Sequence, residues 1–147
     1  MFKRILVPVD GGKASTAGLR TALALARERK ARLRLVHLAQ IVAAPPMADG
    51  YPVAQLYDAI RQTGERLLAR SVRLCAQQGI KCETKMYVAI AERASDVILE
   101  DARKWRPDLI VMGTHGRRGL RRFALGSDAE QVVRAATVPV LLVRAGR

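Results

Sequence analysis

The amino-acid sequence predicts an α/β fold, an open parallel sheet of five strands with helices on both faces. Half of the residues are apolar and only 4% are aromatic, which suits stacked layers of helix and sheet. Short apolar or β-branched runs alternate along the chain with longer segments of helical periodicity. Strands separated by helices imply right-handed parallel crossovers, and the length of 147 residues suits a single domain spanning 1–147.

The first half of the chain contains two predicted strands and two predicted helices. Residues 2–9 are apolar and β-branched apart from two basic residues, so they predict a central strand. A helix over 13–30 follows, with small residues on the face that lies against the sheet. Residues 32–39 predict the second strand. Apolar residues at helical spacing over 53–78 predict the second helix, which Gly79 ends.

The second half begins with a third strand over 81–88, whose polar character suits the edge of a sheet. A helix over 91–105 follows, and Pro107 ends it. The continuous apolar run 109–112 predicts a buried parallel strand, and 139–144 predicts the last one.

A glycine-rich loop and a helix start follow the strand at 109–112. Gly113 ends the strand, and a residue without Cβ permits a sharp turn or the close approach of a ligand. Ser127 and Glu130 have the spacing of a capping box, so a helix is expected to begin here. Its apolar side is expected to contain Val132, Val133 and Ala136.

Such a loop in front of a helix N-terminus favours an anion. Unpaired N–H groups and the positive end of the helix dipole both face the loop, and phosphate is the commonest ligand there. The loop also contains four arginines, Arg117, Arg118, Arg121 and Arg122. The alternative is a long surface loop that merely precedes a well-capped helix.

The spacing Gly113-x2-Gly116-x9-Gly126-Ser127 resembles the nucleotide-binding signature of the universal stress protein family at every fixed position. The resemblance runs along the whole chain, through the stretches Ile5–Gly11, Leu35–Leu38, Pro107–Arg117 and Val138–Val143. It implies a Rossmann-like sheet, of the adenine nucleotide alpha hydrolase-like kind, with strand order 3-2-1-4-5. Ligands of such sheets lie beyond the carboxyl ends of the strands where the winding reverses, here between the first and fourth strands.

The resemblance further implies that ATP binds in this crevice, with Mg²⁺ held through the phosphates. Val9, Leu38 and Met112 would surround the adenine. Gly113 and Gly116 would admit backbone N–H groups to the ribose and phosphates, and Gly126 and Ser127 would contact the β and γ oxygens. The predicted nucleotide-binding residues are Pro8, Val9, Asp10, Leu38, Met112, Gly113, Thr114, His115, Gly116, Arg117, Arg118, Gly126, Ser127 and Asp128.

Several of these residues have a second interpretation. Asp10 either accepts a hydrogen bond from a ribose hydroxyl or caps the following turn, and Ser127 can cap its helix with no ligand present. His115 either contacts the phosphates or is a solvated loop side chain, whereas we interpret His37 as a core or rim residue. Asp128 departs from the Val or Thr usual in the family, and its carboxylate either weakens ATP binding or helps to hold Mg²⁺.

Charge and cysteine content limit the remaining kinds of site and function. The 26 Lys and Arg against 13 Asp and Glu give a formal net charge of +13, which we interpret as spread over solvated helix surfaces. Cys75 and Cys82 show no paired metal-binding motif, so we expect neither a disulfide framework nor a zinc site. The only apolar run near the N-terminus, 5–9, ends at Asp10, so we expect no secretory or membrane-spanning segment and a cytoplasmic protein.

We therefore expect a small cytoplasmic ATP-binding regulatory protein of the stress response, whose nucleotide changes its partner interactions. No general base or nucleophile is evident, so we name no catalytic residue and expect no efficient hydrolysis. One alternative is a basic protein that binds nucleic acid or another polyanion, and a third is a slow ATPase or a protein that phosphorylates itself at Ser127 or a nearby hydroxyl. The apolar last strand, Val138–Val143, predicts a homodimer formed by edge pairing, which the resemblance also implies.

Overall fold

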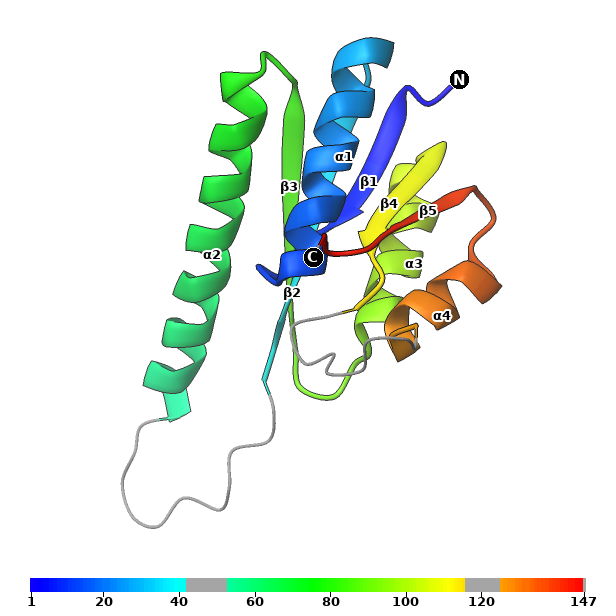
Figure 1. Ribbon diagram of the computed structural model, residues 1–147. Coiled ribbons are helices and arrows are strands. Elements are labelled where there is room, and N and C mark those ends of the chain that lie inside the picture. Colours follow the sequence, from blue (N-terminus) through cyan, green and yellow to red (C-terminus); the bar gives the residue numbers. More distant parts are fainter. Residues whose placement is uncertain (42–52, 116–124, 147) are drawn as a thin grey trace.

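The computed structural model describes residues 1–41, 53–115 and 125–146, which form one parallel sheet of five strands covered by four helices (Figure 1). The strands are β1 Arg4–Pro8, β2 Arg32–Gln40, β3 Cys82–Ala89, β4 Leu109–Gly113 and β5 Val140–Val143. The helices are α1 Lys13–Arg29, α2 Val53–Gln77, α3 Ala94–Trp105 and α4 Ser127–Ala135. The strand order β3-β2-β1-β4-β5 confirms the predicted fold class and places β1 at the centre.

The helices divide into two pairs, one on each face of the sheet (Figure 1). Side chains alternate between the faces along a strand, so Ile5 and Val7 pack beneath α1 and α2 whereas Leu6 packs beneath α3 and α4. The β1 side chains Ile5, Leu6 and Val7 are fully buried. The central strand is therefore covered on both faces, which explains its continuous apolar sequence. Within the described residues, no helix combines the length and hydropathy needed to cross a membrane.

Helix α4 begins where the sequence predicts, but the predicted capping box is wrong. Gly126 is the N-cap and no side chain caps the helix, because the N–H of Glu130 donates to the carbonyl oxygen of Gly126 at 2.9 Å. The carboxylate of Glu130 instead pairs with Arg134 at 2.9 Å. Val133 is also not on the apolar side, since 46% of it is exposed; that side consists of Ala129, Val132 and Ala136.

A glycine in the middle of α2 allows this helix to cover the sheet closely. A Cβ at Gly64 would lie 2.8 Å from both Cδ2 of His37 and Sδ of Met86. Glycine lowers helix propensity, yet α2 continues through Gly64 without interruption. The position is glycine because β2 and β3 side chains occupy the space that a side chain would need. Gly79, with a φ of +67°, follows the helix as predicted.

A buried polar cluster ties α3 to the sheet. Asp101 is fully buried, and its carboxylate accepts hydrogen bonds from Nε and Nη2 of Arg34 at 2.7 and 2.8 Å. Tyr87 donates its hydroxyl to the same carboxylate at 2.7 Å, and Arg34 also reaches Glu83 at 3.1 Å. The hydrogen bonds to Asp101 raise the pKa of Arg34, and burial raises the pKa of Tyr87 to about 12. Tyr87 therefore remains a donor and Arg34 remains charged at physiological pH.

Trp105 extends this cluster to β1 at the end of α3. Its indole Nε1 donates to Glu83, and its backbone carbonyl accepts a hydrogen bond from Arg4. The guanidinium of Arg4 lies over the indole ring, 4.5 Å from its centre, in a cation–π arrangement. The last turn of α3 is thus fixed to β1 and β3 by side chains whose contacts the sequence analysis did not predict.

We expect Asp101→Ala to lower the free energy of unfolding by about 3 kcal/mol, because it removes the main partner of a largely buried arginine. Only 15% of the Arg34 side chain is exposed, and Glu83 remains as its second partner. Urea denaturation followed by circular dichroism measures this loss. The double variant Arg34→Met with Asp101→Leu, which removes both charges, should recover much of it. A loss below about 1 kcal/mol for Asp101→Ala would show that the pair does not hold α3.

Candidate functional site

A crevice of about 850 Å³ opens at the carboxyl ends of the strands. Its walls come from the residues that end β1, β2 and β4, the start of α4, the start of α3 and the N-terminal half of α2. The crossovers change direction between β1 and β4, and the crevice includes this point. Open α/β sheets bind ligands in this position because loops diverge there and leave room between them.

Every predicted site residue that the structure describes lines this crevice: Pro8, Val9, Asp10, Leu38, Met112, Gly113, Thr114, His115, Gly126, Ser127 and Asp128. The remaining three, Gly116, Arg117 and Arg118, lie outside the described residues. The sequence analysis missed the wall formed by α2 and α3, which consists of Ala59, Ile60, Thr63, Gly64, Ala94, Val97 and Ile98. A glycine inside a helical pattern, Gly64, was the one sequence signal for a close approach there.

Asp10 caps the turn between β1 and α1. Its Oδ1 accepts the N–H of Gly12 at 2.7 Å, and its own N–H donates to the hydroxyl of Ser15 at 3.0 Å. Gly11 between them has a φ of +81°, a conformation that favours glycine. The turn-capping interpretation of Asp10 is therefore correct, and the turn holds the carboxylate at the crevice wall.

His37 is a buried residue at the rim of the crevice, as interpreted from the sequence. Only 8% of it is exposed, and its Nδ1 lies 2.7 Å from the carbonyl oxygen of Val9. Because a carbonyl only accepts, Nδ1 carries the proton and donates. This bond joins the ends of β1 and β2, so His37 helps to keep the two strand ends together where they form the crevice wall.

Gly113 is required by the packing of α1 against β4. A Cβ at Gly113 would lie 2.6 Å from the backbone carbon of Ala14 and 2.7 Å from the nitrogen of Ser15. On the other side of the contact, a Cβ at Gly18 would lie 3.3 Å from the backbone nitrogen of Gly113. The first glycine of the signature thus has a structural reason that is independent of any ligand.

Thr114 brings the start of α4 back to the end of β4. Its N–H donates to the carbonyl oxygen of Val143 at 2.9 Å, and its own carbonyl oxygen accepts the N–H of Gly126 at 2.8 Å. Its hydroxyl lies 3.0 Å from Nδ1 of His115. The first turn of α4 and the positive end of its dipole are therefore held beside the crevice.

Asp128 has a structural partner that the sequence did not predict. Its Oδ1 accepts the backbone N–H of Ser95, in the first turn of α3, at 3.0 Å. The N-cap of α3 itself, Arg93, offers no side-chain hydrogen bond. The carboxylate thus satisfies one of the open N–H groups of α3 from the first turn of α4, and the N-terminal ends of both helices lie at the same wall.

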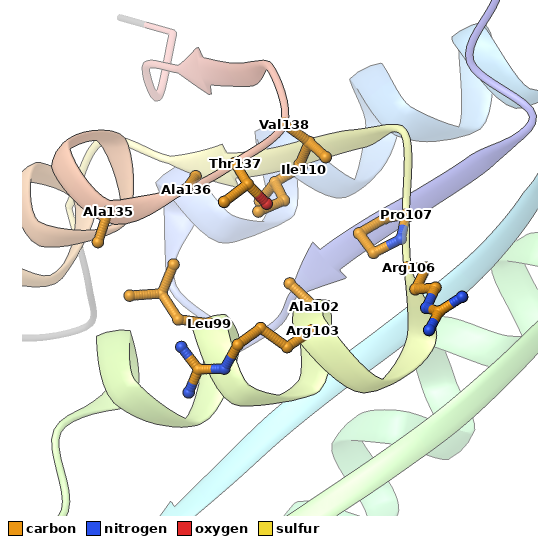
Figure 2. A pocket seen from close by; sticks show the side chains of 10 residues that line it. All are labelled: Leu99, Ala102, Arg103, Arg106, Pro107, Ile110, Ala135, Ala136, Thr137 and Val138. Carbon is orange, nitrogen blue, oxygen red and sulfur yellow. The ribbon is translucent and has the colours of Figure 1, made fainter.

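A second cavity, of about 290 Å³, lies between the C-terminal parts of α3 and α4, at the end of the pair away from the crevice (Figure 2). Its walls come from the C-terminal parts of α3 and α4 and the segments that lead into β4 and β5. None of the described residues predicted for the site lines it. In the part of the chain that the structure describes, no group of three or more His, Cys, Asp or Glu side chains is placed to hold a metal ion.

Comparison with known proteins agrees with the sequence resemblance. The model of the universal stress protein family matches residues 1–144. A universal stress protein of Methanocaldococcus jannaschii is 31% identical over 147 residues, which cover 98% of this chain and 83% of the relative. A crystal structure from the same family, from Burkholderia pseudomallei, is 31% identical with a TM-score of 0.76 and covers 97% of this chain and 96% of that chain. The fold is also similar to an Arabidopsis thaliana family protein with AMP bound, at 20% identity and a TM-score of 0.72, covering 98% and 92% of the two chains.

We expect Gly113→Ala to lower the free energy of unfolding by about 2 kcal/mol, because the added methyl group overlaps the backbone of α1. Thermal and urea denaturation measure the effect. Gly126→Ala is the matched control: Gly126 has a φ of −62° and a ψ of 146°, which any residue adopts, so its stability should stay within about 0.5 kcal/mol of wild type. Equal stability of Gly113→Ala and wild type would contradict the packing role.

Proposed function

The chain belongs to the universal stress protein family, and from this premise we propose that it binds ATP with Mg²⁺ in the crevice at the carboxyl ends of β1 and β4. The observation that carries the proposal is the meeting of the signature residues Gly113, Gly126 and Ser127 at one crevice, beside the N-terminus of α4. The AMP found in the plant relative supports an adenine nucleotide as the ligand class.

The two ends of the crevice suit the two ends of a nucleotide. Val9, Leu38 and Met112 give apolar surface for the base, and the missed residues Val97 and Ile98 add to it. The N-terminal ends of α3 and α4 provide N–H groups and positive dipole ends for the phosphates. We place the ribose between these ends, next to the carboxylate of Asp10.

The carboxylate of Asp128 fits a magnesium nucleotide better than its charge alone suggests. It already accepts the N–H of Ser95, and the positive ends of two helix dipoles offset part of its charge. Mg²⁺ prefers oxygen ligands and is commonly held by one or two carboxylates together with substrate phosphates. Asp10 and Asp128 are the described carboxylates that line the crevice. We therefore favour the Mg²⁺-supporting role of Asp128 over the weakening one.

We propose binding without efficient hydrolysis as the activity of this site. Two histidines are among the described wall residues. His37 lies at the β1–β2 side, whereas the start of α4 is beside β4, and His115 has its Nδ1 3.0 Å from the hydroxyl of Thr114. Ser127 lies at the start of α4. Self-phosphorylation of this residue or of a nearby hydroxyl is the alternative activity of the site. The nucleotide would then act by changing what the protein contacts. The cytoplasmic location and the link to a stress response stay predictions.

We expect Gly126→Val to weaken ATP binding at least about 100-fold, because its side chain occupies space where backbone N–H groups must approach the phosphates. The backbone angles of Gly126 suit valine, so the fold should be retained. Isothermal titration calorimetry with MgATP measures the affinity, and circular dichroism checks the fold. Gly146→Val is the matched control, since a Cβ there meets no atom within 4 Å. Equal affinity of wild type and Gly126→Val would refute the proposed phosphate position.

We also propose that the protein forms a homodimer through β5. This strand pairs with β4 on one side and lies at the end of the sheet order, so its other side is an edge. Leu141 is 38% exposed on this short apolar strand. An uncharged apolar edge favours pairing with a second strand, and two copies related by a twofold axis would extend the sheet.

We expect Leu141→Lys to weaken dimerisation at least about tenfold, since a charged side chain on an edge strand opposes strand pairing. Sedimentation equilibrium at micromolar concentration measures the dissociation constant, and wild type should show twice the monomer mass. Val133→Lys is the control, because Val133 is similarly exposed but lies on α4. A monomeric wild type, or a dimer that Leu141→Lys leaves unchanged, would contradict the placement of the interface at β5.

A further inference from the structure

Basic side chains gather at the end of the sheet where the strands begin, opposite the crevice. We call this set the strand-start surface; its members are all exposed and are Lys3, Arg4, Arg29, Lys30, Arg32, Lys81 and Arg106. They come from the starts of β1, β2 and β3 and from the ends of α1 and α3. They come from four segments that are far apart in the sequence, and the fold brings these segments together.

Backbone contacts establish that these residues are neighbours. Arg4 and Arg32 are register partners on β1 and β2, and the N–H of Leu33 donates to the carbonyl oxygen of Lys81 at 3.1 Å. Neighbouring strands are about 4.8 Å apart, so Arg4, Arg32 and Lys81 form a row with one basic residue on each strand.

Further residues widen this row near β1 and β2. Lys3 accepts the N–H of Arg32 with its carbonyl oxygen and donates Nζ to the carbonyl oxygen of Arg29 at 2.6 Å. Arg106 ends α3 next to Trp105, over which Arg4 lies, and Figure 2 shows it beside Pro107 at the edge of the smaller cavity. The row is therefore part of a broader basic surface at this end of the molecule.

Nearby carboxylates offset only a part of the charge of this surface. The ion pairs of the described residues involve Arg34, Arg61, Lys104 and Arg134, and none involves the strand-start surface. Asp108 accepts the backbone N–H groups of Lys3 and Arg4 at 2.7 and 3.0 Å, and Glu28 precedes Arg29.

Helix dipoles explain only a part of this charge. The C-terminal ends of α1 and α3 contribute about half a negative charge each, which accounts for a basic residue at each helix end. Lys30 and Arg106, the two C-caps, suit that role. The helix dipoles do not explain Arg32 and Lys81, which lie at the starts of strands. Several positive charges therefore remain for an external partner.

We propose that the strand-start surface binds the phosphate backbone of double-stranded nucleic acid without reading its sequence. The row of charges from β1 to β3 spans about 10 Å, which is comparable to three base steps of a duplex. Sequence-independent binding needs only such a set of cations, which release counterions from the duplex. The chain has 4% aromatic residues, so it offers little base stacking for single strands.

An anionic membrane fits this surface less well. Among the described residues, the large apolar side chains that are most exposed are Met1, Val72, Leu74, Val88, Ile90, Leu125, Val133 and Leu141. Of these, Met1 alone belongs to the segment that carries the strand-start surface. A surface that binds membranes through insertion has apolar side chains among its cations, and this one has almost none.

The proposed duplex surface and the nucleotide crevice lie at opposite ends of β1. The five residues of this strand separate them by about 16 Å. Both ligands can therefore be bound at once, and the inference does not rest on the proposed ATP site. It also differs from a duplex site at the crevice itself, which the competition experiment below tests.

The test measures fluorescence anisotropy of a labelled 20-base-pair duplex between 50 and 200 mM NaCl. The variant combines Arg29→Gln, Arg32→Gln and Lys81→Gln. The control combines Arg66→Gln, Arg70→Gln and Arg73→Gln, which removes the same charge from exposed positions of α2. Circular dichroism and urea denaturation check that both variants fold.

We expect wild type to bind with an affinity that falls as salt rises and is unchanged by scrambling the duplex sequence. The variant should lower the slope of log K against log salt by about 2.7, since each lost phosphate contact contributes about 0.9. The control should change the affinity less than about threefold, and saturating MgATP at matched ionic strength should not displace the duplex.

Four outcomes would overturn the proposal. Equal losses of duplex affinity in the variant and the control would mean that the net charge of the protein, and not the strand-start surface, determines binding. Displacement of the duplex by MgATP would place it in or near the crevice. If wild type did not bind the duplex at 50 mM NaCl, double-stranded nucleic acid would not be the ligand of this surface. Tighter binding to vesicles with anionic phospholipid, lost in the variant, would make the partner a membrane.

Discussion

The approach of α1 to the end of β4 is the constraint on which the rest of the site depends. Backbone meets backbone at Gly113 and Gly18, with no side chain between helix and strand. This contact sets where α1 begins, and the turn capped by Asp10 leads directly into it. The carboxyl ends of β1 and β4 are thereby held next to a helix start, and the crevice forms beyond them. Packing therefore fixes the crevice geometry before any ligand enters.

Helix α3 is held by a carboxylate at each end. Asp101 binds Arg34 and Tyr87 near the C-terminal half, and Asp128 of α4 accepts the N–H of Ser95 in the first turn. One of these carboxylates is buried at the sheet and the other lies at the crevice wall. A ligand that contacts the start of α4 is thus connected through Asp128 to α3, which offers a route from the proposed nucleotide to β2 and β3 on the same face of the sheet.

The sequence predicted the strands well because β1 and β4 are continuous apolar runs buried on both faces, a pattern few other structures produce. Their order followed from the family resemblance. Through the family signature the sequence also identified crevice residues whose spacing is local, Gly113 to His115 and Gly126 to Asp128. It failed for contacts that depend on backbone hydrogen bonds or on residues far apart in the sequence. The capping role of Ser127 was wrong because Gly126 supplies the first bond of α4 through its backbone. Nothing in the local sequence around Asp101 or Asp128 indicated partners on other elements.

The hydrogen bond from Gly126 to the carbonyl oxygen of Thr114 closes the segment between β4 and α4 at its base. For a segment whose ends are joined in this way, the entropy of closure grows only slowly with length, by about 0.6 kcal/mol for each doubling. Insertions between these two residues therefore cost little stability, whereas the sheet and the start of α4 keep their positions.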